Sequence, residues 1–181
     1  MKKIAKFEKV SYEIFAKAFS ETDEVRVKAL YESIQLPKRA TRASAGYDFF
    51  LNEDLVLKPG ETALIPTGIR VKMQDEWVLK LYPRSGLGFK YRLQLNNTVG
   101  IIDADYYESD NEGHIFAKIT NDSNEGKTIE LAAHNGFMQG IFVEYGICVD
   151  DEVATQRNGG FGSTSKVNNV VNDEYLVKSP F

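Results

Sequence analysis

The sequence is poor in cysteine, because Cys148 is the single cysteine among 181 residues. A disulfide framework within the chain is therefore excluded. The two histidines, His114 and His134, have no cysteine or second histidine at ligand spacing, so we do not expect a zinc site. Because Cys148 lies in the apolar run 146–149, we expect a small buried side chain and not a nucleophile.

Long hydrophobic runs and an excess of positive charge are also missing. No run approaches the roughly 18 apolar residues of a membrane span, and residues 1–10 carry lysines without an apolar stretch. We therefore expect a cytoplasmic protein that does not bind membranes. The formal net charge is -4, which argues against nucleic acid as a partner. A polyanionic ligand would then need local donors such as Arg84 and Arg157, together with a divalent metal.

What the chain does contain fits one domain with two kinds of periodicity, since 43% hydrophobic and 27% charged residues can bury one core. Residues 4–19 place apolar side chains at near-helical spacing, which predicts an amphipathic helix, or a strand start followed by one. Residues 22–34 predict a second helix, with Asp23 and Glu24 in its first turn. We expect residues 1–36 to form a helical N-terminal extension. It would pack on its own domain or on a sister subunit, or else bind a partner.

From Lys38 onward the apolar pattern has a period of two. Residues 69–73 alternate apolar and polar side chains, and Ile115, Ala117 and Ile119 alternate with Phe116 and Lys118. Turn signals such as Pro59 and Gly60 separate such runs. Short strands at short intervals predict an all-β sandwich or barrel over residues 37–150.

The stretch 82–107 contains most of the candidate catalytic and binding residues. Its first part, residues 83–88 (PRSGLG), follows a run with strand character. Arg84 offers a planar fork of donors, Ser85 a hydroxyl, and Gly86 a backbone that a ligand can approach closely, which together suit a phosphate. The spacing is not that of a Walker loop. A strand-to-helix cap is the alternative interpretation.

The second part of this stretch, residues 96–107, has an apolar centre between polar groups, as expected of a β-hairpin that reaches into a cleft. Asp103 and Asp105 would point to the same side of a regular strand. Two acids at these positions could activate a water, bind a metal or belong to a solvated turn. The residues alone do not decide among these three.

The chain ends in a polar segment, residues 151–181, which contains the glycine-rich run GGFGSTS. A flexible linker is one interpretation of such a composition. Phe161 is flanked by glycines and could instead lie flat on a base, while nearby N–H groups and hydroxyls gather phosphate oxygens. We therefore interpret these residues as a C-terminal arm with a binding role.

Five segments together resemble the motifs of the trimeric dUTP nucleotidohydrolases (dUTPases), in the order found in that family. They are residues 45–48 (AGYD), the two parts of the stretch 82–107, residues 139–143 (QGIFV) and residues 157–165 (RNGGFGSTS). The likeness covers about residues 34–165. It implies a jelly-roll-like β-barrel in a homotrimer, with three active sites at subunit interfaces. It also implies that the arm crosses to another subunit's site and orders over the bound nucleotide.

The resemblance implies a reaction as well. A water would attack the α-phosphate of dUTP, giving dUMP and pyrophosphate, with Mg²⁺ bound to the triphosphate. Asp103 would be the general base, and Asp48 would lie near the water shell of the metal. The expected substrate-binding residues are Arg84, Ser85, Gly86 and Gln139 on the phosphate side, Asn97, Gly100, Ile102 and Tyr106 on the nucleoside side, and Arg157, Phe161, Gly162, Ser163 and Thr164 in the arm.

The choice of base and sugar would follow from hydrogen bonding and space. The acceptors and the N3–H donor of uracil match Asn97 and the backbone of residues 99–102, whereas cytosine reverses two of these groups. A narrow hairpin would leave no room for the methyl group of thymine. Tyr106 would stack under deoxyribose and fill the space that a 2′-hydroxyl needs.

Three departures from the family pattern are visible. Residues 136–138 are GFM where Arg-Ile-Ala is usual, Glu108 stands where Gly is more common, and the fifth motif lacks one residue between Arg157 and Phe161. Two other hypotheses use the same fold. A dCTP deaminase would need a catalytic Glu in a separate strand motif. A non-enzymatic, regulatory nucleotide-binding protein would be expected to lose Asp103 or the arm.

Overall fold

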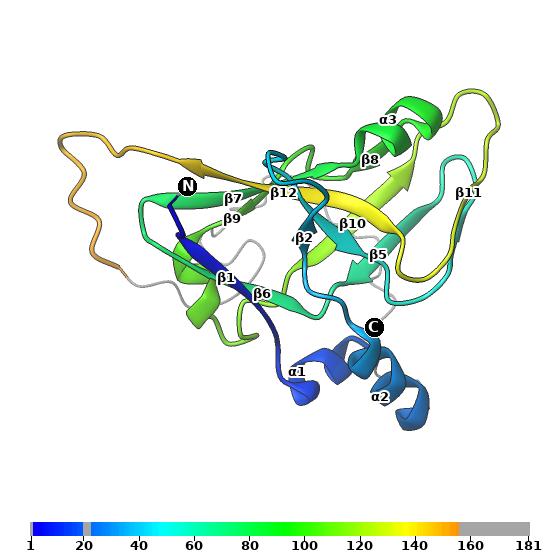
Figure 1. Cartoon of the computed structure of the whole chain (residues 1–181), viewed down its shortest axis with the longest axis horizontal. Coiled ribbons are helices and arrows are strands. Elements are labelled where there is room, and N and C mark those ends of the chain that lie inside the picture. The colour runs from blue at the N-terminus through cyan, green and yellow to red at the C-terminus, as the bar shows by residue number, and fades with distance from the viewer. Residues whose placement is uncertain (1, 20–22, 156–181) are drawn as a thin grey trace, which may run out of the picture.

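The computed structural model describes residues 2–19 and 23–155, which form a mostly β protein with several antiparallel sheets (Figure 1). The elements are β1 (Ala5–Lys9), α1 (Tyr12–Ala16), the 3₁₀ helix η1 (Lys17–Phe19), α2 (Glu24–Ser33), β2 (Lys38–Arg39), β3 (Tyr47–Phe50), β4 (Leu55–Leu57), β5 (Thr62–Pro66), β6 (Ile69–Met73), β7 (Trp77–Pro83), α3 (Ser85–Tyr91), β8 (Leu93–Leu95), β9 (Gly100–Ile102), the 3₁₀ helix η2 (Ala104–Glu108), β10 (Phe116–Asn121), β11 (Ile129–Leu131) and β12 (Gly136–Glu144).

The largest sheet has five strands in the order β2-β3-β12-β7-β9. A second sheet has the order β5-β10-β8, and two further pairs are β1-β6 and β11-β4. None of the sheets in this part of the chain closes into a barrel. The period-two expectation is confirmed on β6, where Ile69, Val71 and Met73 are buried and Lys72 between them is exposed.

The core holds the strands that carry the candidate site. Leu79 and Leu81 of β7, Ile119 of β10 and Phe137 of β12 are each at most 2% exposed. Burying a side chain of this size contributes about 2 kcal/mol. The position and register of β7 and β12 are therefore set by apolar packing. This packing also fixes where the polar residues at the ends of the two strands lie.

The N-terminal extension is part strand and part helix. β1 pairs with β6 and leads into α1 and α2, which lie at the bottom of Figure 1. Ser11 and Asp23 cap these two helices, each accepting a hydrogen bond from a backbone N–H of the first turn. Phe15 and Val27 anchor the helices in the core. A strand start followed by a helix is thus confirmed for residues 4–19, and a continuous helix is wrong.

Two further expectations from the sequence are wrong near the candidate site. Residues 96–107 do not form a hairpin, because β9 pairs with β7 and is followed by η2, while the preceding strand β8 pairs with β10. The turn between β8 and β9 crosses from one sheet to the other. Asp103 caps η2 and Asp105 lies within η2, so the two acids do not alternate along one strand.

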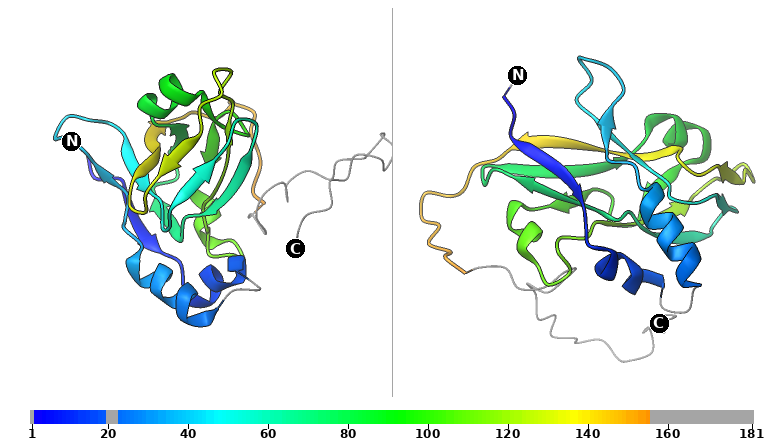
Figure 2. Two further views of the ribbon diagram at one scale, coloured as in Figure 1. Left: turned by 90° about the vertical axis from the view of Figure 1, so that its right-hand side faces the viewer. Right: turned by 60° about the horizontal axis from the view of Figure 1, so that its bottom comes forward.

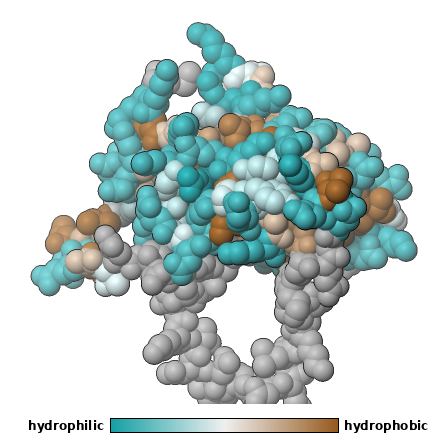
Figure 3. All heavy atoms as spheres, turned by 90° about the horizontal axis from the view of Figure 1, so that it is seen from below, coloured by the Kyte–Doolittle hydropathy of each residue, from teal (hydrophilic) through white to brown (hydrophobic). Residues whose placement is uncertain are grey.

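The expectation that Cys148 is buried is also wrong, because Cys148 is exposed. The chain leaves the sheet after β12, and the segment up to residue 155 projects from the body (Figures 1 and 2). Ile147 on this segment is 73% exposed, and Val149 and Val153 are exposed further. Seen from below, hydrophobic residues gather at the left on this segment, while the rest of the described surface on this face is mostly hydrophilic with scattered hydrophobic spots (Figure 3). Within the described ranges, no helix is long and apolar enough to cross a bilayer.

Candidate active site

The five-stranded sheet brings residues of three sequence motifs into one row. Asp48 of β3 lies opposite Gln139 of β12, and Gln139 lies opposite Tyr82 of β7. Paired strands lie about 4.8 Å apart, so these residues are direct neighbours. Arg84 and Ser85 follow immediately where β7 ends and α3 begins. The residues expected on the phosphate side are therefore gathered at one end of this sheet.

Arg84 bridges two strands of this group. Its Nε lies 3.3 Å from Oδ1 of Asp48, and its Nη1 donates a long hydrogen bond of 3.4 Å to the carbonyl oxygen of Gly136. The side chain of Asp48 is 17% exposed and that of Arg84 is 45% exposed. The guanidinium is thus anchored on one side by a carboxylate and retains donors on its open side for an anion.

The side chain of Gln139 depends on a glycine of the first motif. Its Nε2 donates to the carbonyl oxygen of Pro83 at 3.3 Å. A Cβ added at Gly46 would lie 2.5 Å from Oε1 of Gln139, closer than real Cβ contacts come. Gly46 is therefore required so that Gln139 can occupy its place beside β7.

Residues 83–86, which we call the PRSG turn, connect β7 to α3 and also offer several hydrogen-bond donors. Arg84 is the N-cap residue of α3, and Ser85 and Gly86 form its exposed first turn. N–H groups in a first turn have no acceptor within their own helix. A Cβ added at Gly86 would meet nothing within 4 Å, so its backbone is open to approach. The cap interpretation is confirmed as geometry, and it leaves the donors that a phosphate would use.

A second group of expected residues lies on β9 and η2. Gly100 is buried opposite Leu81, and a Cβ there would lie 2.9 Å from the Cβ of Leu81, so only glycine allows this approach. Asp103 is exposed and caps η2. Asn97 is exposed in the turn that precedes β9. Because β9 is the last strand in its sheet, its outer backbone groups have no strand partner in this part of the chain.

Tyr106 is more buried than a residue that only stacks on a ligand. Its ring is 5% exposed. Its hydroxyl donates to the carbonyl oxygen of His114 at 2.8 Å and accepts from Nδ2 of Asn111 at 2.8 Å. The tyrosine therefore fixes the loop after η2 to the core. Its predicted stacking under deoxyribose stays a prediction.

Asp103 and Ser85 lie toward opposite ends of β7. Asp103 follows Ile102, which pairs with Leu79, whereas Ser85 lies beyond the other end of the strand. A strand advances about 3.3 Å per residue, so roughly 20 Å separates Asp103 from Ser85 along β7. Within one chain, these two residues cannot contact the same phosphate group.

The described residues contain no group of three His, Cys, Asp or Glu side chains that could hold a metal ion by themselves. Mg²⁺ is commonly bound through one or two carboxylates, retained waters and substrate phosphates. The partly exposed carboxylate of Asp48, next to the PRSG turn, fits that kind of site. It would hold the metal through water in the presence of a triphosphate.

The arm residues expected at the site, which are Arg157, Phe161, Gly162, Ser163 and Thr164, lie outside the described residues. A cavity of about 460 Å³ lies elsewhere, lined by Ile14, Leu64 and Phe116 among others, and it contains none of the candidate residues. Nothing in the sequence indicates the hydrogen bond between Tyr107 of η2 and Glu8 of β1. No local pattern could have paired them, because 99 residues separate them in the chain.

Comparison with known proteins connects these features to one family. The family model described as dUTPase matches residues 32–165. The deoxyuridine 5′-triphosphate nucleotidohydrolase of Lactococcus lactis subsp. lactis is 43% identical over 144 residues, which is 78% of this chain and 95% of that protein. The protein of the same name from Paraburkholderia xenovorans is 40% identical over 141 residues, 73% of this chain and 90% of that protein.

Solved structures show the same fold. The crystal structure of dUTPase from Streptococcus mutans superposes with a TM-score of 0.59 at 36% identity, covering 78% of this chain and 97% of that one. A point mutant of the dUTPase from phage phi11 of S. aureus also gives a TM-score of 0.59, at 21% identity, over 84% of this chain and 98% of that one. The phage protein coordinates a structural Mg(II) ion.

Proposed function

This chain belongs to the dUTPase family and hydrolyses dUTP, and we propose that it forms dUMP and pyrophosphate by attack of a water on the α-phosphate. One observation carries the assignment of the site. Asp48, Gln139 and the PRSG turn come from three motifs far apart in sequence, yet the register of β3, β12 and β7 places them side by side. The proteins from Lactococcus lactis and Paraburkholderia xenovorans are named as dUTP nucleotidohydrolases, which favours hydrolysis over a deaminase or a purely regulatory binding role.

The active site is completed between chains. Asp103 and Ser85 are roughly 20 Å apart along β7, which is too far for one phosphate group to reach both. A homotrimer in which the Asp103 end of one chain meets the Ser85 end of the next would join them, with three equivalent sites.

Asp103 is the general base. Its carboxylate is exposed at the N-cap of η2, so a water can reach it. It accepts the proton of the attacking water and so increases the nucleophilicity of that oxygen toward the α-phosphorus. Loss of such a group usually costs about 10²- to 10⁴-fold in rate.

The phosphate side binds and orients the leaving group. The hydroxyl of Ser85, the N–H groups of Ser85 and Gly86 and the open face of Arg84 donate to phosphate oxygens. Gln139 supports the same region from β12. Asp48 holds the water shell of Mg²⁺, which when bound to the triphosphate neutralises charge that develops on the leaving pyrophosphate.

The residues on the nucleoside side recognise uracil through backbone hydrogen-bonding groups. The outer edge of β9 presents N–H and C=O groups between Gly100 and Ile102, and Asn97 adds a side-chain amide. Cytosine would leave buried polar groups unpaired, at a cost of about 1 to 3 kcal/mol each. Tyr106 excludes a 2′-hydroxyl below the sugar. Arg157, Phe161, Gly162, Ser163 and Thr164 complete the site as a closing arm.

The proposed function is tested by measuring pyrophosphate release over the four canonical dNTPs, dUTP and UTP, with and without Mg²⁺. Strong release from dUTP alone, dependent on Mg²⁺, supports the proposal. Ammonia release from dCTP would instead identify a deaminase. No turnover of any of these nucleotides by the intact oligomer would contradict enzymatic function.

A further inference from the structure

A group of charged and aromatic side chains joins the N-terminal strand to η2. The hydroxyl of Tyr107 donates to Oε2 of Glu8 at 2.6 Å. The guanidinium carbon of Arg70 lies 4.2 Å from the centre of the Tyr107 ring, within the range of a cation–π contact. Arg70 also lies 3.6 Å from the same carboxylate of Glu8, its partner in the β1–β6 register. One residue of η2 is thus held by two strands.

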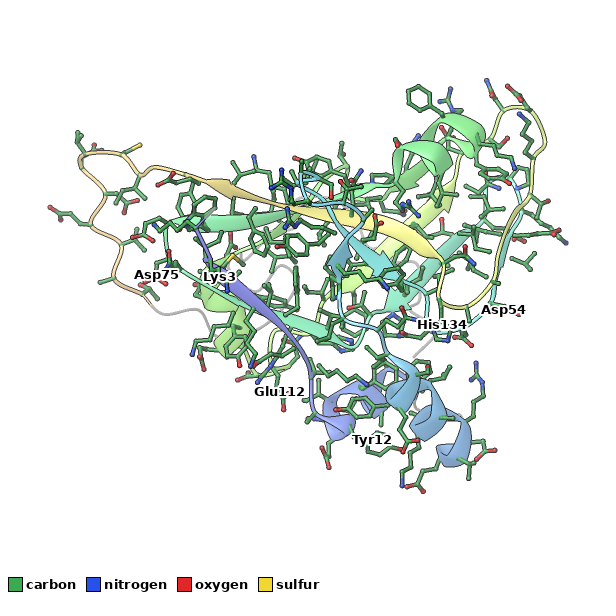
Figure 4. All side chains as sticks on the ribbon, viewed as in Figure 1. Lys3, Tyr12, Asp54, Asp75, Glu112 and His134 are labelled. Atoms are coloured by element: carbon green, nitrogen blue, oxygen red, sulfur yellow. The ribbon has the colours of Figure 1, made fainter. Side chains whose placement is uncertain are left out.

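The loop after η2 is held by the same part of the chain. Oε2 of Glu112 accepts a hydrogen bond from the backbone N–H of Ser11 at 2.7 Å. Arg70 lies 3.7 Å from Glu112 as well, so its guanidinium stands between two carboxylates. Figure 4 labels Glu112 on this loop and Tyr12 where α1 begins, just after Ser11. The segment after Asp103 is therefore attached to the N-terminal strand at two points.

The opposite side of η2 is fixed to the core. There the Tyr106 hydroxyl bonds with the His114 carbonyl and with Asn111. Consecutive tyrosines therefore anchor η2 in two directions, Tyr106 inward and Tyr107 toward β1. Asp103 occupies the N-cap position of this short helix, so its backbone is displaced when η2 is displaced.

We propose that Glu8 and Tyr107 are positioning residues for dUTP hydrolysis, which hold η2 so that Asp103 faces the attacking water. The proposal rests on the proposed role of Asp103 as general base. A displacement of about 1 Å in a catalytic group can cost about 10²-fold in rate. The side chains of Glu8 and Arg70 are 26% and 23% exposed, so the contact lies mostly out of solvent.

The carboxylate of Glu8 stays charged throughout the useful pH range. Hydrogen bonds from Lys6 and, next, from Tyr107 lower the pKa of Glu8 to about 2. The same hydrogen bond raises the pKa of Tyr107 above its ordinary value. The donor and the acceptor thus keep the protonation states that the contact needs while the enzyme works.

The test uses Tyr107→Phe, Glu8→Ala and the double variant, assayed as the intact oligomer. Each single change is expected to lower kcat about five- to twentyfold while KM for dUTP stays within about twofold. The double variant should be no slower than the slower single variant, because the hydrogen bond that Tyr107→Phe removes is already lost in Glu8→Ala. Glu8→Gln keeps an acceptor and should recover most of kcat.

Tyr31→Phe is the matched control. The Tyr31 hydroxyl donates to the carbonyl oxygen of Val10 at 2.8 Å, so the variant also loses one tyrosine hydrogen bond within the N-terminal part. Its kcat should stay within about twofold of the parent value. A kcat in Tyr107→Phe equal to that of this control, or multiplying losses in the double variant, would overturn the proposal.

Hydrogen exchange without substrate separates this proposal from the proposed function. Backbone amides of residues 104–112 should exchange several times faster in Tyr107→Phe and Glu8→Ala than in the parent or in Tyr31→Phe. Unchanged exchange would overturn the proposal even if kcat falls. If the variants exchange faster but the parent protein does not hydrolyse dUTP, the attachment of η2 by Glu8 and Tyr107 stands. In that case the proposed function is overturned instead.

Discussion

The guanidinium of Arg84 occupies the space that a side chain at Gly136 would need. A Cβ added at Gly136 would lie 2.9 Å from Nη1 of Arg84 and 3.2 Å from its Cδ. This gives a physical meaning to the departure at residues 136–138, where the family usually has Arg-Ile-Ala. In this chain the glycine leaves room for an arginine that reaches across from the end of β7.

Gly136→Ala should displace the Arg84 side chain from Asp48 and weaken substrate binding. We expect KM for dUTP to rise about three- to tenfold, with a smaller change in kcat. Steady-state kinetics with Mg²⁺ in excess would measure both. Gly146→Ala is the matched control, because a Cβ there meets nothing within 4 Å. Equal KM values for the two variants would show that the position of Arg84 does not matter for binding.

Asp103→Asn should abolish most of the turnover and leave binding nearly intact. Asparagine keeps the size of the side chain but cannot accept the proton of the water, so kcat should fall by at least about a hundredfold. Binding of a non-hydrolysable dUTP analogue, followed by calorimetry, should change little. Asp75→Asn removes an exposed carboxylate from the turn between β6 and β7 and should keep full activity. Nearly normal turnover in Asp103→Asn would exclude it as the base.

Changes at Tyr106 should affect stability and sugar choice separately. Tyr106→Ala removes a buried ring and two hydrogen bonds, so the free energy of unfolding should fall by about 3 to 5 kcal/mol. Below the melting temperature of this variant, UTP should become a substrate, whereas Tyr106→Phe should still reject it. Equal rejection of UTP by both variants would place the sugar filter elsewhere.

As the pH is lowered, protonation linked to His114 should reduce the free energy of unfolding at a higher pH than protonation of the carboxylates does. Nε2 of His114 accepts the N–H of Gly68 at 2.9 Å, and burial lowers the pKa of the imidazole from 6.5 to about 4. The unfolded chain therefore binds more protons between these values, and stability falls as the pH drops from about 6.5 to 4. The full loss is about 3 kcal/mol, from 1.36 kcal/mol per pKa unit.

Urea unfolding at pH 7.5 and pH 5 would measure this dependence. Glu8 and Glu112 have lowered pKa values, so their contribution is lost only below about 4.5, outside this window. His114→Gln keeps an acceptor for Gly68 and should flatten the response between the two pH values. A parent protein with equal stability at both would contradict a neutral buried His114.

The sequence predicts local features well because their causes are local. The second helix was expected at residues 22–34 and is found at Glu24–Ser33, where Asp23 caps it. The alternation over β6 matches the structure closely, whereas β7 buries the adjacent residues Val78 and Leu79 and so departs from strict alternation. At residues 83–88 the expected strand-to-helix connection is found, while phosphate binding there stays a prediction from the chemistry of Arg84, Ser85 and the glycines.

Features set by pairing between distant strands could not be predicted in the same way. The apolar pattern of β8 and β9 is the same whether they form a hairpin or join two sheets, and only their partners β10 and β7 decide this. For the same reason the sequence pattern places Asp105 on a strand, although it lies within η2. The contact between Glu8 and Tyr107 could not be predicted from the sequence, because it depends on the register of β1 with β6.

The central claim is that each active site combines the Ser85 end of one chain with the Asp103 end of another, and subunit mixing tests it most directly. Ser85→Ala and Asp103→Asn chains should each be nearly inactive. When equal amounts are unfolded and refolded together, a quarter of the sites should pair an intact Ser85 with an intact Asp103 from a neighbouring chain. We therefore predict recovery of about a quarter of the parent dUTPase activity in the mixed oligomer. A mixed oligomer that forms but stays as inactive as the separate variants would mean that each site belongs to a single chain, and would contradict the account.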